Sequence, residues 1–185
     1  MNTFLRRAAV VLLPLALWLP VGLAAPGAAQ AATSECRRTL EAYPELDPGD
    51  RAPAVRTLQC AINDLGLGPV AVDGFYGPET KKALTPVVMG REGQPPHPYR
   101  LTPLFWHQLY GLQLPHHTLR EGDHGHDVRN LQRALRAYGI GVVVDGDFGP
   151  QTTSAVQAYQ EQHQIRQTGR TDRSTRFYLV GGDYY

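Results

Sequence analysis

The stretch VDGDFGPQTTSAV, residues Val144–Val156, has a near copy upstream: VDGFYGPETKKAL at Val72–Leu84. In both, an Asp-Gly pair and a Gly-Pro pair come directly before a run with apolar residues at helical spacing. Proline is tolerated in the first turn of a helix, where its missing amide hydrogen costs nothing. Pro78 and Pro150 therefore mark the starts of two helices, and each stretch is predicted to be the corner that leads into one.

Glycine, aspartate and an aromatic residue have separate tasks in such a corner. Gly146 and Gly149 are expected to adopt backbone angles that a Cβ atom would forbid. Asp145 can accept hydrogen bonds from amides of its own turn. We expect Phe148, and Tyr76 at the matching position of the first copy, to fill a small core from the loop.

The similarity extends beyond the two corners. Gly49–Leu84 aligns with Gly122–Val156, with one extra residue in the first copy near Gly68. Each segment opens with apolar residues at i, i+3 and i+7, the pattern of a helix with one buried face. These residues are Val55, Leu58 and Ile62 in one copy and Val128, Leu131 and Leu135 in the other. Gly66 and Gly139 follow as helix stop signals. A third short helix is expected near 171–179, with its counterpart at 101–109, so the fold class is all-α.

The second copy resembles a known family. Leu119–Gln160 contains LREGDHGHDVRNLQRALRAYG, VDGDFGPQT and AVQAYQ in that order. This order is similar to the three-helix peptidoglycan-binding module of bacterial cell-wall hydrolases. The first copy resembles it less closely, because Pro86 is expected to interrupt its second helix and a proline-rich loop, GREGQPPHPYR, follows at 90–100. The first copy has Trp106 in its third helix, where the second has Arg176.

The expected organisation is two tandem, small, three-helix peptidoglycan-binding-like modules after a signal peptide. We predict a signal peptide at 1–31, a divergent first module at 35–112, a linker at 113–118 and a second module at 119–182.

The first 31 residues have the anatomy of a secretory signal peptide. MNTFLRR supplies positive charge, an apolar run follows, and small residues precede a cleavage site that we place after Ala31. A membrane anchor is the rival interpretation. Pro14 and Pro20 interrupt the apolar run, which is shorter than the roughly 20 residues that a membrane span needs. We therefore expect a secreted, wall-associated protein with no stable membrane anchor.

The net charge bears on the possible partners, and the cysteine count bears on a disulfide. Removing Arg6 and Arg7 with the signal peptide leaves 16 Lys and Arg against 17 Asp and Glu, a net charge of −1. A near-neutral protein lacks the basic surface typical of nucleic-acid binding, so no nucleic-acid partner is expected. Cys36 and Cys60 are the two cysteines, and an even number in an exported chain predicts one disulfide.

A cluster of histidines suggests a zinc site as an alternative. The cluster lies in HHTLREGDHGHD and comprises His116, His117, His124 and His126. Imidazole binds zinc readily, and HGHD is faintly similar to zinc-peptidase signatures. The first copy does not keep His124 or His126, however, so we predict no metal and no cofactor. A small cell-wall hydrolase or zinc peptidase using the His116–His126 cluster remains the alternative function.

Other catalytic signatures are weak. A calcium loop starting at Asp145 would need an oxygen ligand at its fifth position and glutamate at its twelfth, where Gly149 and Val156 stand. The sequence has no Gly-x-Ser-x-Gly, Ser-x-x-Lys or His-Glu-x-x-His motif. Paired carboxylates for glycoside cleavage stay open, but two repeats leave no room for a separate catalytic domain. We predict a protein that is not an enzyme.

The resemblance implies a shallow groove that accepts the stem peptide or the glycan of peptidoglycan. The ligand offers carboxylates, amides and hydroxyls, which suit arginine forks, amide side chains and an aromatic platform. The candidate ligand-binding residues are Arg129, Gln132, Asp145, Asp147 and Phe148. Each has an alternative role in the turn, the core or the solvated helix face. The predicted function is non-catalytic binding of peptidoglycan. A secreted hydrolase is a further candidate partner, which the chain could assist or inhibit.

Overall fold

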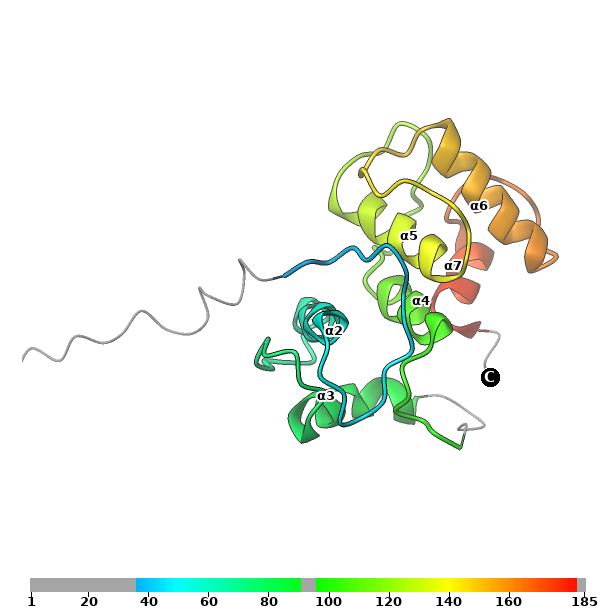
Figure 1. Cartoon of the computed structure of the whole chain (residues 1–185). Coiled ribbons are helices and arrows are strands. Elements are labelled where there is room, and N and C mark those ends of the chain that lie inside the picture. The colour runs from blue at the N-terminus through cyan, green and yellow to red at the C-terminus, as the bar shows by residue number, and fades with distance from the viewer. Residues whose placement is uncertain (1–35, 91–95, 183–185) are drawn as a thin grey trace, which may run out of the picture.

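The computed structural model describes residues 36–90 and 96–182, and their secondary structure is helical apart from turns and isolated bridges. The predicted signal peptide lies outside these residues. Figure 1 shows α2 and α3 on one side of the molecule and α5–α7 on the other, with α4 between them; along the chain, we call α2–α4 the first half and α5–α7 the second. The helices are α2 (Pro53–Asp64), α3 (Pro78–Met89), α4 (Pro103–Gly111), α5 (His126–Ala137), α6 (Pro150–Gln162) and α7 (Arg173–Leu179). The predicted all-α class is confirmed.

The first helix of each half buries the predicted apolar stripe. Val55, Leu58, Ile62, Val128, Leu131 and Leu135 are all fully buried. Gly66 and Gly139 follow the two helices with φ of 71° and 100°, a left-handed conformation that favours glycine. The spacing of apolar residues therefore predicted both the helices and the faces that they bury.

Each of the two corners combines a glycine in a left-handed conformation with a buried aromatic residue. Gly74 and Gly146 have φ of 79° and 89°, as expected for glycine in a tight turn. Tyr76 and Phe148 enter the core and are almost completely buried. The expectation for Gly149 was wrong, because its φ of −92° and ψ of −170° describe ordinary extended backbone.

The same backbone hydrogen bonds recur at matching positions of the two halves. The amide of Tyr76 donates to the carbonyl of Asp50, and the amide of Phe148 donates to that of Asp123, both at 2.9 Å. Near the third helix, Leu101 donates to the carbonyl of Leu46 and Thr171 donates to that of Leu119. The local geometry is therefore shared well beyond the quoted corners.

The second helix of the first half is longer than expected. Pro86 lies inside α3, which continues to Met89 instead of stopping. A proline in a helix removes one amide donor and crowds the carbonyl four residues earlier. The bond that Pro86 cannot donate would go to the carbonyl of Lys82, so α3 gives up one backbone hydrogen bond and continues for three more residues.

The two halves share one continuous core. Helix α4 packs more extensively on α5 than on α2, and it also contacts α7. His107 of α4 is fully buried; its Nδ1 donates to the carbonyl of Ala134 at 2.9 Å, and its Nε2 lies 3.0 Å from the Tyr159 hydroxyl. Gly111, at the end of α4, lies directly against the carbonyl of Leu179. Helix α4 is thus the element that joins the halves.

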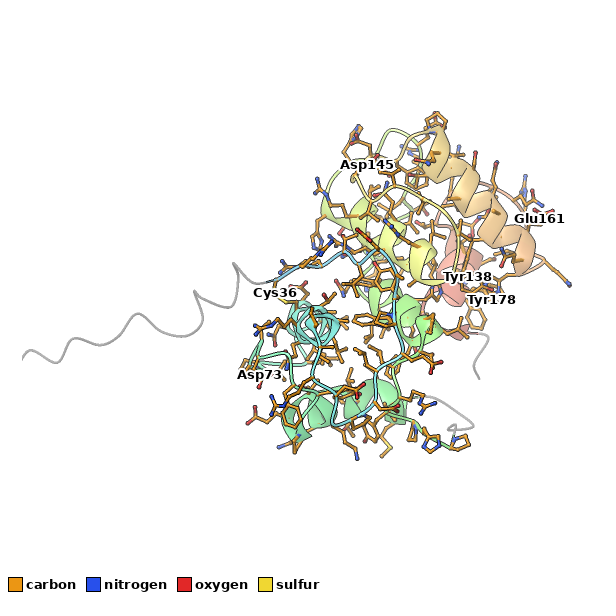
Figure 2. The ribbon with its side chains drawn as sticks, viewed as in Figure 1. Cys36, Asp73, Tyr138, Asp145, Glu161 and Tyr178 are labelled. Carbon is orange, nitrogen blue, oxygen red and sulfur yellow. A yellow bond between two sulfur atoms is a disulfide. The ribbon has the colours of Figure 1, made fainter. Side chains whose placement is uncertain are left out.

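The N-terminal segment also connects both halves. The predicted disulfide between Cys36 and Cys60 is confirmed and fixes this segment to α2 (Figure 2). Farther along, the guanidinium of Arg133 on α5 donates to the Thr39 hydroxyl at 3.0 Å. Across the described ranges, no helix has the length and apolar character of a membrane span.

Candidate functional site

A buried glutamine organises the corner of the second half. The amide nitrogen of Gln132 donates to the Asp145 carboxylate at 2.7 Å and to the Asp147 carbonyl and the Thr152 hydroxyl, each at 3.1 Å. Its amide oxygen accepts from the amide of Gly146 at 2.9 Å. Gln132 is fully buried, so it holds the turn in shape and presents no surface to a ligand.

The same glutamine arrangement occurs twice more. In the first half, Gln59 contacts the Asp73 carboxylate, the Phe75 carbonyl and the Thr80 hydroxyl, and it accepts from Gly74. In the turn before α7, Gln160 makes the corresponding contacts with Thr168, Arg170, Thr175 and Gly169. The third instance was not predicted. Its sequence signal is a pattern shared by all three: an Asp or Thr directly before glycine, with threonine seven residues later.

Three of the five predicted ligand-binding residues are exposed around this corner: Arg129, Asp145 and Asp147. The Arg129 side chain lies against Gly146, where a Cβ atom would touch the guanidinium. Hydrogen bonds from the Asp147 amide and then from Gln132, with the nearby charge of Arg129, lower the pKa of Asp145. Phe148 is fully buried and belongs to the core. Ligand binding by these residues stays a prediction.

An exposed pair differs between the two corners. In the second half, His124 Nδ1 lies 2.8 Å from the Asp147 carboxylate, and both side chains are about two-thirds exposed. In the first half, the guanidinium of Arg51 lies 4.0 Å from the centre of the Phe75 ring. The two corners share a backbone bridge at this position but present different chemistry, a histidine–carboxylate contact in one and a cation–π contact in the other.

The predicted histidine cluster is spread over separate contacts. His116 lies 3.3 Å from the guanidinium of Arg176, His124 contacts Asp147, and His126 lies 3.3 Å from the Asn130 amide. Over the described residues, no three His, Cys, Asp or Glu side chains are grouped as they would be around a metal ion.

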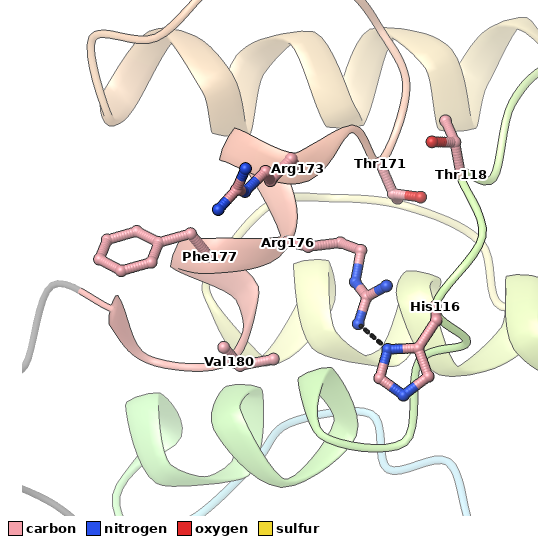
Figure 3. A pocket seen from close by; sticks show the side chains of 7 residues that line it. All are labelled: His116, Thr118, Thr171, Arg173, Arg176, Phe177 and Val180. Carbon is pink, nitrogen blue, oxygen red and sulfur yellow. Dashed lines mark hydrogen bonds between the residues drawn. The ribbon is translucent and has the colours of Figure 1, made fainter.

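A groove of about 500 Å³ lies between α7 and the predicted linker. We call it the α7 groove, and its lining is His116, Thr118, Thr171, Arg173, Arg176, Phe177 and Val180. Figure 3 shows the Arg176 side chain reaching from α7 toward His116. Sequence analysis did not select these arginines, because the resemblance pointed to the corner instead.

A second hollow of about 520 Å³ borders the α7 groove at Thr118. Its lining includes Arg166, Arg170 and Asp172. The carboxylate of Asp172 accepts hydrogen bonds from Thr175 and Thr168, so it caps α7 and holds the turn. The segment RQTGRTDRSTR, residues 166–176, therefore carries four arginines and one engaged aspartate, a net charge of +3.

A third hollow, of about 390 Å³, lies at the corner of the first half. Its lining includes Asp73, Phe75 and Glu79. Asp73 accepts hydrogen bonds from the Phe75 amide and from Gln59, which lower its pKa. This hollow is more acidic than the two beside α7.

Comparison with known proteins places a family match on the second half. Residues 124–176 match the family model described as "Putative peptidoglycan binding domain". Among solved structures, the chain is similar to "The crystal structure of SleB N-terminal domain", with 30% identity and a TM-score of 0.36. That similarity covers 37% of this chain and 96% of the other. Comparison with curated proteins finds no match.

Proposed function

Because the chain contains a peptidoglycan-binding-like helical domain, we propose that it binds cell-wall peptidoglycan without cutting it. One observation carries this proposal: the family match at 124–176 runs from the first residues before α5 into α7. It therefore includes the corner, α6 and the arginine-rich segment. The first half, with its matching turn geometry, is proposed to be a divergent second copy of the same unit.

The exposed chemistry of the second half suits such a ligand. Peptidoglycan carries carboxylates and amides on its peptides and hydroxyls on its sugars. Arginine guanidinium groups bind carboxylates through paired, charge-assisted hydrogen bonds. Exposed carboxylates such as Asp145 and Asp147 can accept hydrogen bonds from sugar hydroxyls or peptide amides. The corner and the α7 groove thus offer complementary groups on the matched unit.

The five residues predicted from sequence divide into two roles in this proposal. Arg129, Asp145 and Asp147 are exposed and are available for direct contact. Gln132 and Phe148 are buried and support the corner from below. Substitutions of the second group would therefore change binding only by changing the fold.

We also propose that the protein is exported and that it binds the wall without cutting it. The sequence carries a signal-peptide pattern and no catalytic motif that we recognise. The disulfide is in keeping with an oxidising compartment. A hydrolase partner would supply cutting activity where it is needed.

Sedimentation with purified peptidoglycan tests this function. The mature chain, from Ala32, is mixed with insoluble peptidoglycan or with chitin, which shares N-acetylglucosamine but has no peptides. We expect the protein to sediment with peptidoglycan. A protein that remains in the supernatant in both tubes would contradict the proposal, and equal sedimentation with chitin would show a general glycan binder.

A further inference from the structure

We propose that the α7 groove binds the free carboxylates of the peptidoglycan peptide, with Arg173 and Arg176 as the principal contacts. This inference rests on the proposed function and specifies which part of the polymer the second half recognises. It also moves the main contacts away from the corner, where the sequence had placed them.

The groove holds positive charge that the fold does not neutralise. Arg173 is exposed and Arg176 is partly buried, and along the described chain neither forms an ion pair with a carboxylate. The Arg176 guanidinium contacts the ring nitrogen of His116 at 3.3 Å. A histidine ring nitrogen can accept one hydrogen bond from a guanidinium, but unlike a carboxylate it brings no negative charge. The charge therefore remains available to an anionic ligand.

The floor of the groove is rigid. Thr171 is buried, its amide donates to the carbonyl of Leu119 at 3.0 Å, and its hydroxyl accepts from the Leu119 amide at 2.7 Å. These two bonds fix the linker side of the groove to the start of α7. Thr118, the neighbour of Leu119, lies at the boundary with the second hollow. A preformed site loses less entropy on binding than one that must be ordered first.

In the first half, the positions that correspond to the α7 groove are filled by core side chains. The shared alignment places Tyr43 and Trp106 where the second half has His116 and Arg176. Tyr43 and Trp106 are 7% and 0% exposed, and their ring centres lie 5.6 Å apart. The Trp106 indole donates to the carbonyl of Pro44 at 2.9 Å. The Tyr43–Trp106 pair closes this place in the first half, whereas His116 and Arg176 line an open groove in the second.

The groove combines hydrogen-bond donors with an apolar edge, which suits a peptide carboxylate next to small apolar side chains. Its two arginines and its threonines can donate hydrogen bonds, while Phe177, 53% exposed, and Val180 give it an apolar edge. A peptide with free carboxylates and small apolar side chains presents the complementary surface. Arg166 and Arg170 in the neighbouring hollow extend the positive charge along the path that a longer peptide would follow. In intact peptidoglycan the lactyl carboxyl of the sugar is joined to the peptide in an amide bond, so the free carboxylates lie on the peptide.

Charge removal in the groove is the direct test. The variant Arg173→Gln/Arg176→Gln keeps hydrogen-bond donors and removes two charges. The matched control Arg37→Gln/Lys82→Gln removes two charges from exposed side chains in the first half. The single variant Arg176→Lys keeps the charge and loses the planar fork. Melting temperatures of all variants, followed by circular dichroism, check that each is folded.

Binding isotherms are measured by sedimentation with insoluble peptidoglycan freed of phosphate polymers by hydrofluoric acid. A second sample of the same material has its carboxyl groups amidated, and a third is the untreated wall, which keeps its phosphate polymers. We expect Arg173→Gln/Arg176→Gln to bind unmodified material at least tenfold more weakly than the wild type, and the control to stay within twofold. Arg176→Lys should bind with intermediate affinity. Amidation should weaken wild-type binding to the level of the double variant.

The outcomes separate this inference from the proposed function. Wild-type protein that binds peptidoglycan while the double variant binds equally well would overturn the groove assignment alone. Equal binding to amidated material would overturn carboxylate recognition. Binding that appears only before hydrofluoric acid treatment would assign the groove to phosphate. Failure of the wild type to bind any of these samples would overturn both the function and the groove.

Discussion

Replacement of Gln132 by alanine should reveal how much of the second half depends on one buried amide. The side chain makes four hydrogen bonds, to Asp145, Asp147, Thr152 and Gly146. In the variant Gln132→Ala, the amide of Gly146 loses its acceptor while remaining in a buried position. The Thr152 hydroxyl keeps its own bond to the Asp147 carbonyl at 3.1 Å, and water can reach the exposed Asp145 carboxylate.

The loss in unfolding free energy can be estimated from the groups that lose a partner. An orphaned buried amide costs about 2 kcal/mol. Loss of one buried methylene group adds about 0.8 kcal/mol. We therefore expect Gln132→Ala to lower the free energy of unfolding by about 3 kcal/mol. For a protein of this size, that corresponds to a fall in melting temperature of roughly 10 °C.

Urea and thermal unfolding, followed by circular dichroism, measure the effect. Gln151→Ala is the matched control, because Gln151 is an exposed glutamine on α6. Its unfolding free energy should change by no more than about 0.5 kcal/mol. A loss below about 1 kcal/mol for Gln132→Ala would refute the reasoning that this amide holds the corner.

Three further predictions concern the connections between the halves. The double variant Cys36→Ser/Cys60→Ser should lose roughly 3 kcal/mol in urea unfolding, because a disulfide spanning 24 positions restricts the unfolded chain; unchanged stability would contradict this. Burial lowers the pKa of His107 from 6.5 to about 4, so the unfolded chain takes up a proton below pH 6.5 that the folded chain resists. Stability should therefore fall by roughly 2 to 3 kcal/mol between pH 7.5 and pH 4.5, and a variant His107→Gln that keeps the full pH dependence would disprove that origin. Gly111→Ala should cost about 3 kcal/mol, because its Cβ would overlap the Leu179 carbonyl, whereas Gly141→Ala meets no atom within 4 Å and should be tolerated in the same thermal melts.

Local structure was predictable from the sequence because its causes are local. The i, i+3, i+7 stripes identified α2 and α5, and the prolines at 78 and 150 marked the starts of α3 and α6. Pro86 was misjudged for an equally local reason. One proline removes one backbone hydrogen bond from a helix, and α3 continues past it to Met89.

The joining of the two halves was not predictable in the same way. The alignment suggested two modules with a linker at 113–118, and nothing in the periodicity of α4 indicates that it packs mainly on α5. That contact depends on His107 finding the Ala134 carbonyl and the Tyr159 hydroxyl, both distant in sequence. Buried polar contacts of this kind arise from tertiary structure, and no spacing rule encodes them.

In the candidate site, too, some features were predictable from local sequence and others depended on tertiary structure. The sequence selected the corner because its residues repeat, but Gln132 and Phe148 repeat for structural reasons. The groove that we favour is a place where the repeats differ, with Arg176 in one and Trp106 in the other. The sequence showed this difference, but only the structure showed that one residue fills a core and the other faces a groove.

The most direct test of the account follows binding and cutting in one tube. Mature protein is incubated with purified peptidoglycan, turbidity is recorded over time, and the pellet is then assayed for protein, with and without a metal chelator. The account predicts that the protein sediments, that turbidity stays constant, and that chelator changes neither result. Clearing of the suspension that chelator abolishes would contradict it and identify a metal-dependent hydrolase instead.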